Sequence, residues 1–335
     1  IVGTSMSESA AATAVSAATD DDVEVESAGF SGLAVQAVGY GISGDKDESV
    51  IVYVSRGSKA HLKRLASKVD SVEVLNAGRV VVYPESASGS TNRANLFLRR
   101  NRIACGSSCA PAGENYSGTF GAIVSRGEDL FALSNNHVFA AGNHTPVGQP
   151  ILSPSGSDAR PNLPAPTEIC RQSEIIELRS GSPALVPLVS SDTAIAQIVD
   201  DTKVSSWQGD RSDGYDTPSD TEDPVPGMKV KKFGRTTGLT YGVVEAIIPT
   251  PFPLPYKCEK FSALVFLADI ISIRVVDGES FALPGDSGSL VVTDDGNFSV
   301  GLLFATNKRG DIAYIANINT VLSSLQLELV DDHGV

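Results

Sequence analysis

From residue 117 onward, short apolar segments recur between turns, and this recurrence limits the fold more than any other feature. A turn at 126–129 separates the first two segments, which predicts a hairpin, and a helix is expected at 320–325. This spacing is typical of an all-β sandwich or a pair of barrels. The predicted strands are 119–124, 130–134, 229–233, 241–248, 264–276, 289–293, 300–304 and 312–315.

The N-terminal part follows another pattern. Residues 29–85 contain predicted strands around a helix with apolar positions at helical spacing, and we expect a small α/β accessory module. It offers no plausible catalytic residue, so regulation, assembly or substrate docking is its expected role; packing into the barrels to complete their core is the alternative. Its predicted elements are strands 35–41, 50–54, 72–75 and 79–83 and helix 59–68.

Composition changes divide the chain further. We expect a disordered acidic arm at the start, a linker rich in Ser, Asn and Arg, a β-barrel domain with an acidic connection between its barrels, and a short tail. The corresponding ranges are 1–28 for the arm, 29–85 for the module, 86–112 for the linker, 113–330 for the barrels, 199–226 for the connection and 331–335 for the tail.

Charge and cysteine usage narrow the functional classes. The chain has 40 acidic and 26 basic side chains, a formal charge of −14, which disfavours binding to a phosphate backbone. No apolar run approaches the ~20 residues of a membrane span, and nothing at the start has the pattern of a secretory signal. We therefore expect a cytoplasmic, intracellular protein that binds neither nucleic acid nor membrane, while homo-oligomerisation stays open.

The four cysteines do not form a disulfide framework. Cys105 and Cys109 lie four positions apart, whereas Cys170 and Cys258 stand alone. Reduced thiols fit a cytoplasmic protein, and a strained local disulfide between the first two is the alternative. Because no Cys-x-x-Cys pair or close Cys/His partner is present, a zinc site is disfavoured.

Residues 283–290, Leu-Pro-Gly-Asp-Ser-Gly-Ser-Leu, carry the strongest chemical signal. A serine hydroxyl becomes a nucleophile only when a base takes its proton and backbone amides face the developing oxyanion. The glycines on either side of Ser287 permit a tight turn and leave the amides uncovered. An ordinary turn is the alternative for the tetrapeptide alone, but an apolar strand follows it, as expected of a nucleophile loop.

A base and an orienting acid can be assigned by position and order. Of the four histidines, His137 lies just after a predicted strand, in Leu-Ser-Asn-Asn-His-Val, whereas the others lie in the module, a loop and the tail. Asp192 enters an apolar stretch, where it is suited to hold an imidazole tautomer. A structural histidine and a strand-edge charge are the alternatives for each residue alone. Together with Ser287 they predict a catalytic triad.

The order His–Asp–Ser with Gly-Asp-Ser-Gly resembles the chymotrypsin/trypsin-like serine peptidases. The resemblance is nearest to the bacterial trypsin-like peptidases without secretion signals, related to the plant narrow-leaf proteases. It covers about residues 113–330, on the strings at 118–124, 133–138 and 232–240. It implies a mainly β, chymotrypsin-like double β-barrel with the triad where the barrels meet, and the amides of Gly285 and Ser287 as the oxyanion hole.

The resemblance also poses the question of what faces Asp286. In secreted relatives a freed Ile-Val-Gly terminus pairs with the corresponding aspartate. This chain begins Ile1-Val2-Gly3, but a whole module separates that segment from His137. Cleavage between Arg102 and Ile103 is a second possibility. The favoured one is a site that is formed without cleavage, or gated by an activator, in which Asp286 has another partner.

Substrate preference is predicted from the same resemblance. It places the pocket floor near Phe281 and Ala282 and a wall at Phe304, Ala305 and Thr306. The absence of an acid there disfavours Arg or Lys, and Phe281 predicts a shallow apolar pocket. The alternative is that Phe281 packs in the barrel core and says nothing about the substrate.

These observations predict a serine endopeptidase that acts on a protein or peptide substrate and needs no metal or organic cofactor. The first alternative is a catalytically gated or silent protein of the same fold that serves as a binding module or scaffold. The second is an esterase that uses the same acyl chemistry.

Overall fold

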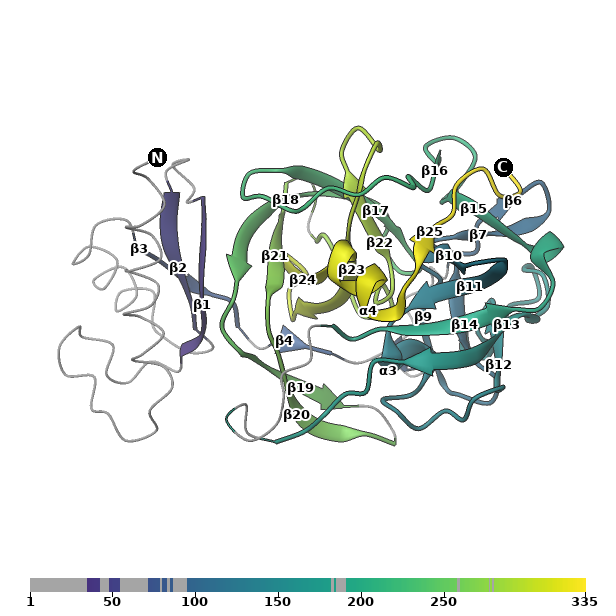
Figure 1. Cartoon of the computed structure of the whole chain (residues 1–335), viewed down its shortest axis with the longest axis horizontal. Helices are drawn as coiled ribbons and strands as arrows, with labels where there is room; N and C mark the ends of the chain where they lie inside the picture. Colours follow the sequence, from purple (N-terminus) through teal and green to yellow (C-terminus); the bar gives the residue numbers. More distant parts are fainter. Residues whose placement is uncertain are drawn as a thin grey trace.

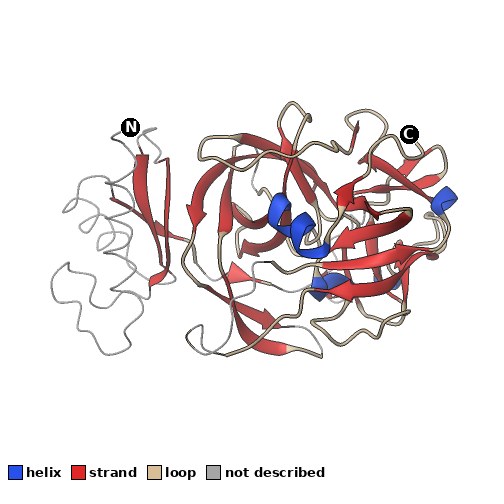
Figure 2. Cartoon of the chain, in the orientation of Figure 1, coloured by secondary structure: helices blue, strands red, loops and turns tan. Residues whose placement is uncertain are grey.

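Within the computed structural model, strands dominate the described part of the chain (Figure 2). The α-helices there, α3 (Asn136–Phe139) and α4 (Ile318–Leu325), are short. No helix in that part is long and apolar enough to cross a bilayer. The structure describes residues 35–42, 48–54, 72–78, 80–82, 85–86, 95–181, 184, 191–257, 260–276, 278 and 280–335.

The C-terminal half of the chain forms a closed barrel. Six strands follow one another in hydrogen-bonded order, and the first and last also pair, which closes the cylinder. Apolar side chains such as Val230, Ile273 and Leu303 fill it. In ladder order the strands are β17 (Lys229–Gly234), β22 (Leu290–Thr293), β23 (Ser299–Asn307), β24 (Ile312–Asn317), β21 (Ile270–Val275) and β18 (Gly238–Ile248).

The preceding part of the chain forms a nine-stranded sheet that curves into a half-barrel. Phe120, Ile123 and Phe139 lie in its core. The closed barrel and the half-barrel confirm the predicted double β-barrel fold. In order the strands are β25 (Glu328–Leu329), β10 (Ala122–Arg126), β11 (Asp129–Ser134), β14 (Ala194–Ile198), β13 (Thr167–Ile175), β12 (Pro150–Ser153), β8 (Ser108–Pro111), β9 (Tyr116–Thr119) and β5 (Glu85–Ser86).

Strands from the N-terminal region extend the sheet of the closed barrel (Figure 1). β1 (Val35–Ile42) pairs antiparallel with β18, and β2 (Glu48–Val54) and β3 (Val72–Asn76) continue outward. Tyr53 belongs to the same apolar core as residues of the barrel. This arrangement favours packing of the module onto the barrels, the alternative left open above. The predicted helix at 59–68 and the arm at 1–28 lie outside the described residues.

The expected linker contains strands, which corrects the prediction for residues 86–112. β6 (Leu98–Arg99) and β7 (Arg102–Cys105) form a hairpin, and β8 joins the half-barrel. β7 also pairs in parallel with β15 (Val204–Gln208), which lies in the expected acidic connection at 199–226 and precedes β16 (Tyr215–Asp216). The polar composition of both segments concealed these strands, and the partner of β7 in β15 lies about a hundred positions away in sequence.

One predicted strand is in fact two. The segment 264–276 is divided into β20 (Ser262–Leu267) and β21 by a turn in which Asp269 has a φ of 54°. β20 pairs with β19 (Phe252–Lys257), which was not predicted because two of its residues are proline. The β19–β20 hairpin projects from the closed barrel. β4 (Val80–Val81) lies within the predicted strand at 79–83, of which residues 79 and 83 lie outside the described residues.

Three cysteines are buried as free thiols. Cys105, Cys109 and Cys170 all lie within the core of the half-barrel, so the disulfide considered for the first two is not formed. Burial raises the pKa of each thiol, which keeps them in their unreactive protonated form. Cys258 lies outside the described residues.

Stability is expected to depend on pH through Glu245, which is buried where β1 joins β18. Burial raises the pKa of Glu245 to about 6, against the opposing charge of Arg274 and the Tyr53 hydroxyl. A carboxyl whose folded pKa lies above its unfolded value stabilises the fold at low pH, and this contribution is lost as pH rises through about 6. We expect Glu245→Gln to remove this loss of stability, because glutamine stays neutral at every pH. The free energy of unfolding of the variant, relative to the unsubstituted protein, should rise by about 2 kcal/mol between about pH 4 and pH 8.

Urea unfolding at the two pH values measures this difference. The matched control is Glu128→Gln at an exposed acid, which should show no such dependence. An unchanged difference between Glu245→Gln and the unsubstituted protein across this range contradicts the expectation.

Candidate active site

Strand pairing brings His137 and Asp192 together. β11 and β14 are antiparallel neighbours, with Ser134 opposite Ala194. α3, which carries His137, begins directly after β11, and Asp192 directly precedes β14, so the two side chains emerge at the same end of the sheet. The Asn135 side chain donates to the carbonyl oxygen of Asp192 at 2.7 Å and fixes the two segments to each other.

The two side chains form a buried hydrogen-bonded pair. His137 Nδ1 lies 2.5 Å from Asp192 Oδ2, and both side chains are fully buried. The backbone N–H of His137 donates to Asp192 Oδ1 at 3.2 Å. Because a carboxylate only accepts, the proton of the neutral ring lies on Nδ1, and Nε2 presents a lone pair. Nε2 is buried without a hydrogen-bond partner in the described part of the chain.

Tyr256 completes the surroundings of the carboxylate. Its hydroxyl donates to Asp192 Oδ2 at 2.8 Å. Its ring meets the imidazole of His137 edge to face, with centroids 6.0 Å apart. The tyrosine comes from β19 of the projecting hairpin, so an element of the second barrel restrains both residues supplied by the first.

The loop at 283–290 holds Ser287 between the barrels. Gly285 and Gly288 have φ values of 97° and 96°, and a Cβ at Gly288 would lie 2.2 Å from Ser134 Oγ. Glycine is therefore required on both sides of the serine. The N–H of Thr119, in β9, donates to the carbonyl oxygen of Ser287 at 2.9 Å, which ties the loop to the half-barrel.

The hydroxyl of Ser287 forms no hydrogen bond to the imidazole of His137. Ser287 Oγ lies 3.5 Å from the carbonyl oxygen of Phe304, and the residue is 8% exposed. Neither Ser287 nor Gly285 donates a backbone hydrogen bond to another described residue, so the amides expected at the oxyanion remain available.

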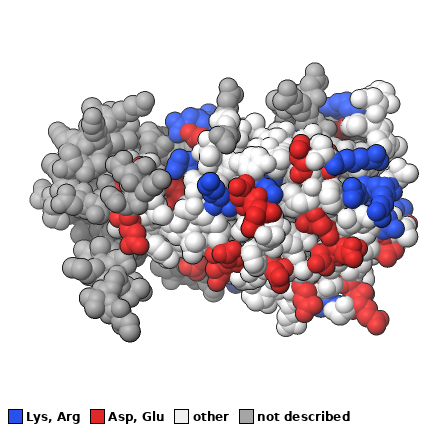
Figure 3. All heavy atoms as spheres, turned by 90° about the horizontal axis from the view of Figure 1, so that it is seen from above, with Lys and Arg blue, Asp and Glu red and all other residues white. Residues whose placement is uncertain are grey.

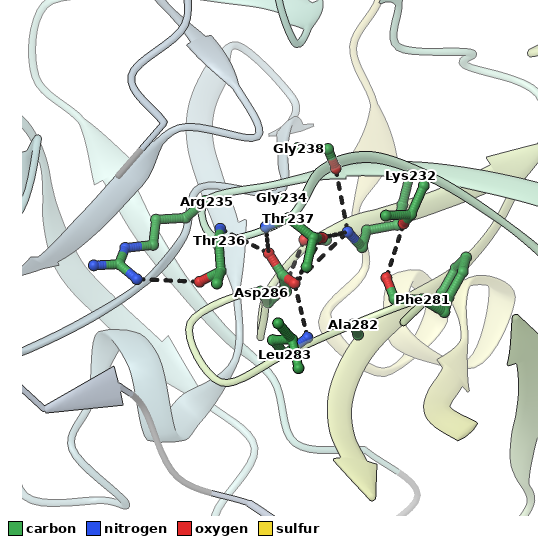
Figure 4. A network of polar contacts seen from close by, with 12 residues as sticks. Lys232, Gly234, Arg235, Thr236, Thr237, Gly238, Phe281, Ala282, Leu283 and Asp286 are labelled. Carbon is green, nitrogen blue, oxygen red and sulfur yellow. Dashed lines mark hydrogen bonds and ion pairs between the residues drawn. The ribbon is translucent and has the colours of Figure 1, made fainter. Parts of the chain in front are cut away.

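Asp286 is held by partners within the chain (Figure 4). Its Oδ1 accepts from the N–H groups of Thr236 and Thr237 at 2.8 and 3.1 Å. Its Oδ2 accepts from the N–H of Leu283 at 2.9 Å, and the buried ammonium of Lys232 lies 3.7 Å away. Burial lowers the pKa of Lys232, and the charge of Asp286 opposes that shift. These contacts fix the residue that precedes Ser287.

Because Asp286 already has partners within the chain, it does not need a new N-terminus created by cleavage between Arg102 and Ile103. Ile103 is buried in β7 and pairs with both Leu98 and Val204, so cleavage after Arg102 would break a strand in the middle of a sheet. Ile1 lies outside the described residues. The partner of Asp286 in this structure is Lys232, together with the turn that follows β17.

A second buried ion pair joins the barrels. Arg235, from the turn after β17, donates through Nε to Asp158 Oδ2 at 2.6 Å, and its second nitrogen meets Oδ1. Asp158 belongs to η2 (Gly156–Asp158) of the first barrel and also accepts from Ser108 at 2.5 Å. Burial alone raises the pKa of Asp158, but the bonds and charge of Arg235 outweigh it and hold that pKa below its ordinary value.

The expected pocket residues do not all line a pocket. Phe281 is fully buried in the core of the closed barrel, the alternative considered for it above. Ala282 is buried beside it, and its carbonyl accepts from Thr306 Oγ1 at 3.1 Å. Ala305 and the side chain of Phe304 are buried as well. A preference for small or medium residues cannot therefore rest on Phe281.

Comparisons with known proteins give a likeness of fold. No family model and no curated protein matches the chain. Protease A of Thermobifida fusca is 17% identical, over 68% of this chain and 99% of that one, with a TM-score of 0.45. The chymotrypsin of Cellulomonas bogoriensis is 18% identical over 68% and 97%, with a TM-score of 0.43. The structural neighbours are chymotrypsin-like serine proteases.

Sequence reasoning missed three members of the site. Tyr256 lies in Phe-Pro-Leu-Pro-Tyr, where no motif marks it, and Asp158 is far from every motif. Lys232 lies in the string that carried the resemblance, and Val230 and Phe233 close to it in sequence were the one signal of burial. Among the remaining histidines, His144 and His333 contact backbone carbonyls elsewhere, and His61 lies outside the described residues.

Proposed function

We propose that the chain is a serine endopeptidase. Ser287 attacks the peptide carbonyl, and His137 accepts the hydroxyl proton of Ser287 and later transfers it to the leaving amine. Asp192 orients the imidazole of His137 and stabilises its positively charged form. The observation that carries the proposal is the buried His137–Asp192 pair, whose Nε2 has no hydrogen-bond partner among the described residues. The serine loop packs through Gly288 against Ser134, three residues before His137. The free thiols support an intracellular, cytoplasmic location, and we retain the kinship with non-secreted, narrow-leaf-related peptidases as part of the proposal.

The chemistry follows from these positions. His137 Nε2 takes the proton of Ser287 as the oxygen bonds to the substrate carbon, and the amides of Gly285 and Ser287 receive the oxyanion. The imidazolium then protonates the leaving amine as the C–N bond breaks. Water attacks the acyl carbon and gives its proton to Nε2; the bond from that carbon to Ser287 Oγ then breaks, Nε2 returns the proton to Oγ, and the acid is released. Asp192 and Tyr256 hold the ring throughout.

One observation favours the alternative of a gated protein. The hydroxyl of Ser287 points to Phe304 rather than to His137, so the nucleophile and the base are not yet hydrogen-bonded. Such bonds often tighten only when substrate is present.

The second alternative, an esterase, is tested separately. Comparing the turnover of matched amide and ester substrates distinguishes an endopeptidase from an esterase.

Mapping of a fluorophosphonate adduct tests the proposal. The phosphonyl group should attach to Ser287 on prolonged incubation, and the adduct, located by mass spectrometry, should disappear with His137→Ala. An adduct at another serine, or equal labelling of the His137→Ala protein, argues against the proposed site.

Tyr256→Phe measures how much the hydrogen bond from the Tyr256 hydroxyl to Asp192 contributes to catalysis. Hydrogen bonds to charged groups contribute about 1.5–3 kcal/mol, so kcat/KM should fall by roughly 10- to 100-fold. The phenylalanine retains the ring against His137, so KM should change little. A loss of stability without change in kcat would assign Tyr256 a packing role only.

A further inference from the structure

The hydroxyl of Thr236 makes two hydrogen bonds whose directions are set by its neighbours. Nη1 of Arg235 lies 3.1 Å from Thr236 Oγ1, and a guanidinium only donates (Figure 4). The single hydrogen of the hydroxyl is therefore left for the carbonyl oxygen of Pro284, which lies 2.8 Å away and only accepts. Thr236 thus holds the Pro284 carbonyl, one residue before Gly285 in the nucleophile loop.

That carbonyl belongs to the same peptide unit as the N–H of Gly285, one of the two amides that the proposed chemistry assigns to the oxyanion. The bond between Pro284 and Gly285 is trans, so the C=O and N–H of the unit point in opposite directions. The N–H of Gly285 therefore points away from Thr236. It donates to no other described residue, which leaves it free for a substrate oxygen.

The local backbone does not by itself fix this peptide. Gly285 has a φ of 97°, and glycine populates regions of positive and negative φ about equally readily. The following peptide is held separately, because Thr119 Oγ1 donates to the carbonyl oxygen of Gly285 at 2.9 Å. Rotation of the Pro284–Gly285 plane would place a carbonyl oxygen where the N–H should be, and an acceptor would face the developing negative charge. A contact from outside the loop is needed to hold the productive orientation.

Packing on both sides restricts Thr236 itself. The residue is 7% exposed, and a Cβ at Gly285 would lie 2.4 Å from Thr236 Oγ1. The N–H of Thr236 donates to Asp286 Oδ1 at 2.8 Å. Arg235, which donates to the hydroxyl, is paired in turn with Asp158 of the first barrel. Contacts from both barrels therefore fix the hydroxyl against the Pro284 carbonyl.

We propose that Thr236 is a positioning residue of the oxyanion hole, whose hydroxyl keeps the Pro284–Gly285 peptide turned with the N–H of Gly285 toward the oxyanion. The inference rests on the proposed function and deepens it. Thr236 acts through Gly285 and does not itself contact the reacting atoms. Without the hydroxyl the peptide plane rotates, and the tetrahedral intermediate loses one of its two donors.

Thr236→Val tests the proposal, because valine has nearly the shape of threonine but no hydroxyl. The probe is a fluorophosphonate, whose phosphoryl oxygen needs the oxyanion hole while Ser287 Oγ displaces fluoride. The rate of labelling at Ser287 should fall by about 10²-fold, the lower end of the loss that follows removal of one oxyanion-hole donor. Thr236→Ser keeps the hydroxyl and should retain most of the rate. Thr236→Ala replaces the valine variant should that variant not fold.

The matched control is Thr240→Val. Thr240 Oγ1 donates to the carbonyl oxygen of Phe281 at 2.8 Å, so this substitution removes the same kind of bond from a peptide outside the oxyanion hole. The two valine variants should lose similar stability in urea unfolding. Thr240→Val should nevertheless slow labelling less than about tenfold. A merely structural role for Thr236 would slow both variants alike.

Crystal structures of the two valine variants show the orientation of the Pro284–Gly285 peptide whether or not Ser287 reacts. The Pro284 carbonyl should have turned in Thr236→Val alone. An unturned peptide, or measurable labelling that is equal in the two variants, overturns the positioning role; an adduct at Ser287 of the unsubstituted protein then leaves the peptidase standing. A turned peptide in a chain whose Ser287 never reacts refutes the peptidase and leaves Thr236 as the residue that orients this peptide.

Discussion

Ser287→Ala is expected to lower kcat by about 10⁵- to 10⁶-fold on a peptide substrate while leaving the fold intact. The substitution removes one oxygen from a loop held by backbone bonds to both barrels, so melting should change little. His137→Ala should be about as severe, and the double variant no worse than either, because members of a triad act as a unit. The residual rate comes from the oxyanion hole and substrate binding.

Ser289→Ala is the matched control in the same loop. Ser289 Oγ donates to the carbonyl oxygen of Asp286 at 2.6 Å and has no place in the proposed chemistry. Its loss should reduce kcat less than about tenfold. Steady-state kinetics of purified proteins measures both effects. Near-normal turnover by Ser287→Ala would remove the basis of the assignment.

Arg235→Ala should give the largest loss of stability, about 3–5 kcal/mol in the free energy of unfolding. The substitution leaves the carboxylate of Asp158 buried between the barrels without its charge partner. Because Arg235 holds the folded pKa of Asp158 below its ordinary value, the stabilisation is present near neutral pH and disappears as pH falls through that folded pKa.

Denaturant unfolding at neutral pH measures the loss. Arg171→Ala is the control, because Arg171 and Glu168 form a half-exposed pair that should contribute below about 1 kcal/mol. Replacing both buried partners, as Arg235→Met with Asp158→Leu, should recover most of the stability. Equal losses from Arg235→Ala and Arg171→Ala would show that the buried pair does not hold the barrels together.

The fold was predictable where strands have regular apolar patterns. The expected strands at 130–134, 229–233 and 312–315 all lie within observed strands of the barrels. Prediction failed where the partner strand lies far away in sequence, or where a strand contains residues that are unusual in strands. β7 pairs in parallel with β15, about a hundred positions away in sequence, and β19 contains two prolines.

The candidate site divides in the same way. Ser287, His137 and Asp192 were found because each lies in a local motif or at the end of an apolar strand. Tyr256 was not, because its position depends on how the β19–β20 hairpin packs across the barrels, and no local pattern encodes that packing. Lys232 was overlooked because a lysine in a strand ordinarily points to solvent, whereas here Asp286 compensates for its burial.

The route of β25 constrains how the protein is made. β25 follows the closed barrel in sequence, yet it pairs with β10 at the edge of the half-barrel, after α4 has carried the chain across (Figure 1). During synthesis on the ribosome, the half-barrel emerges first, but its sheet lacks β25 until the residues after the second barrel have been translated. On the face shown in Figure 3, basic side chains gather mainly in the upper part of the view and acidic side chains mainly in the lower part. During that interval the edge of β10 that β25 will cover is open to association with other nascent chains, so we expect slower translation of the second barrel to lower the yield of native protein.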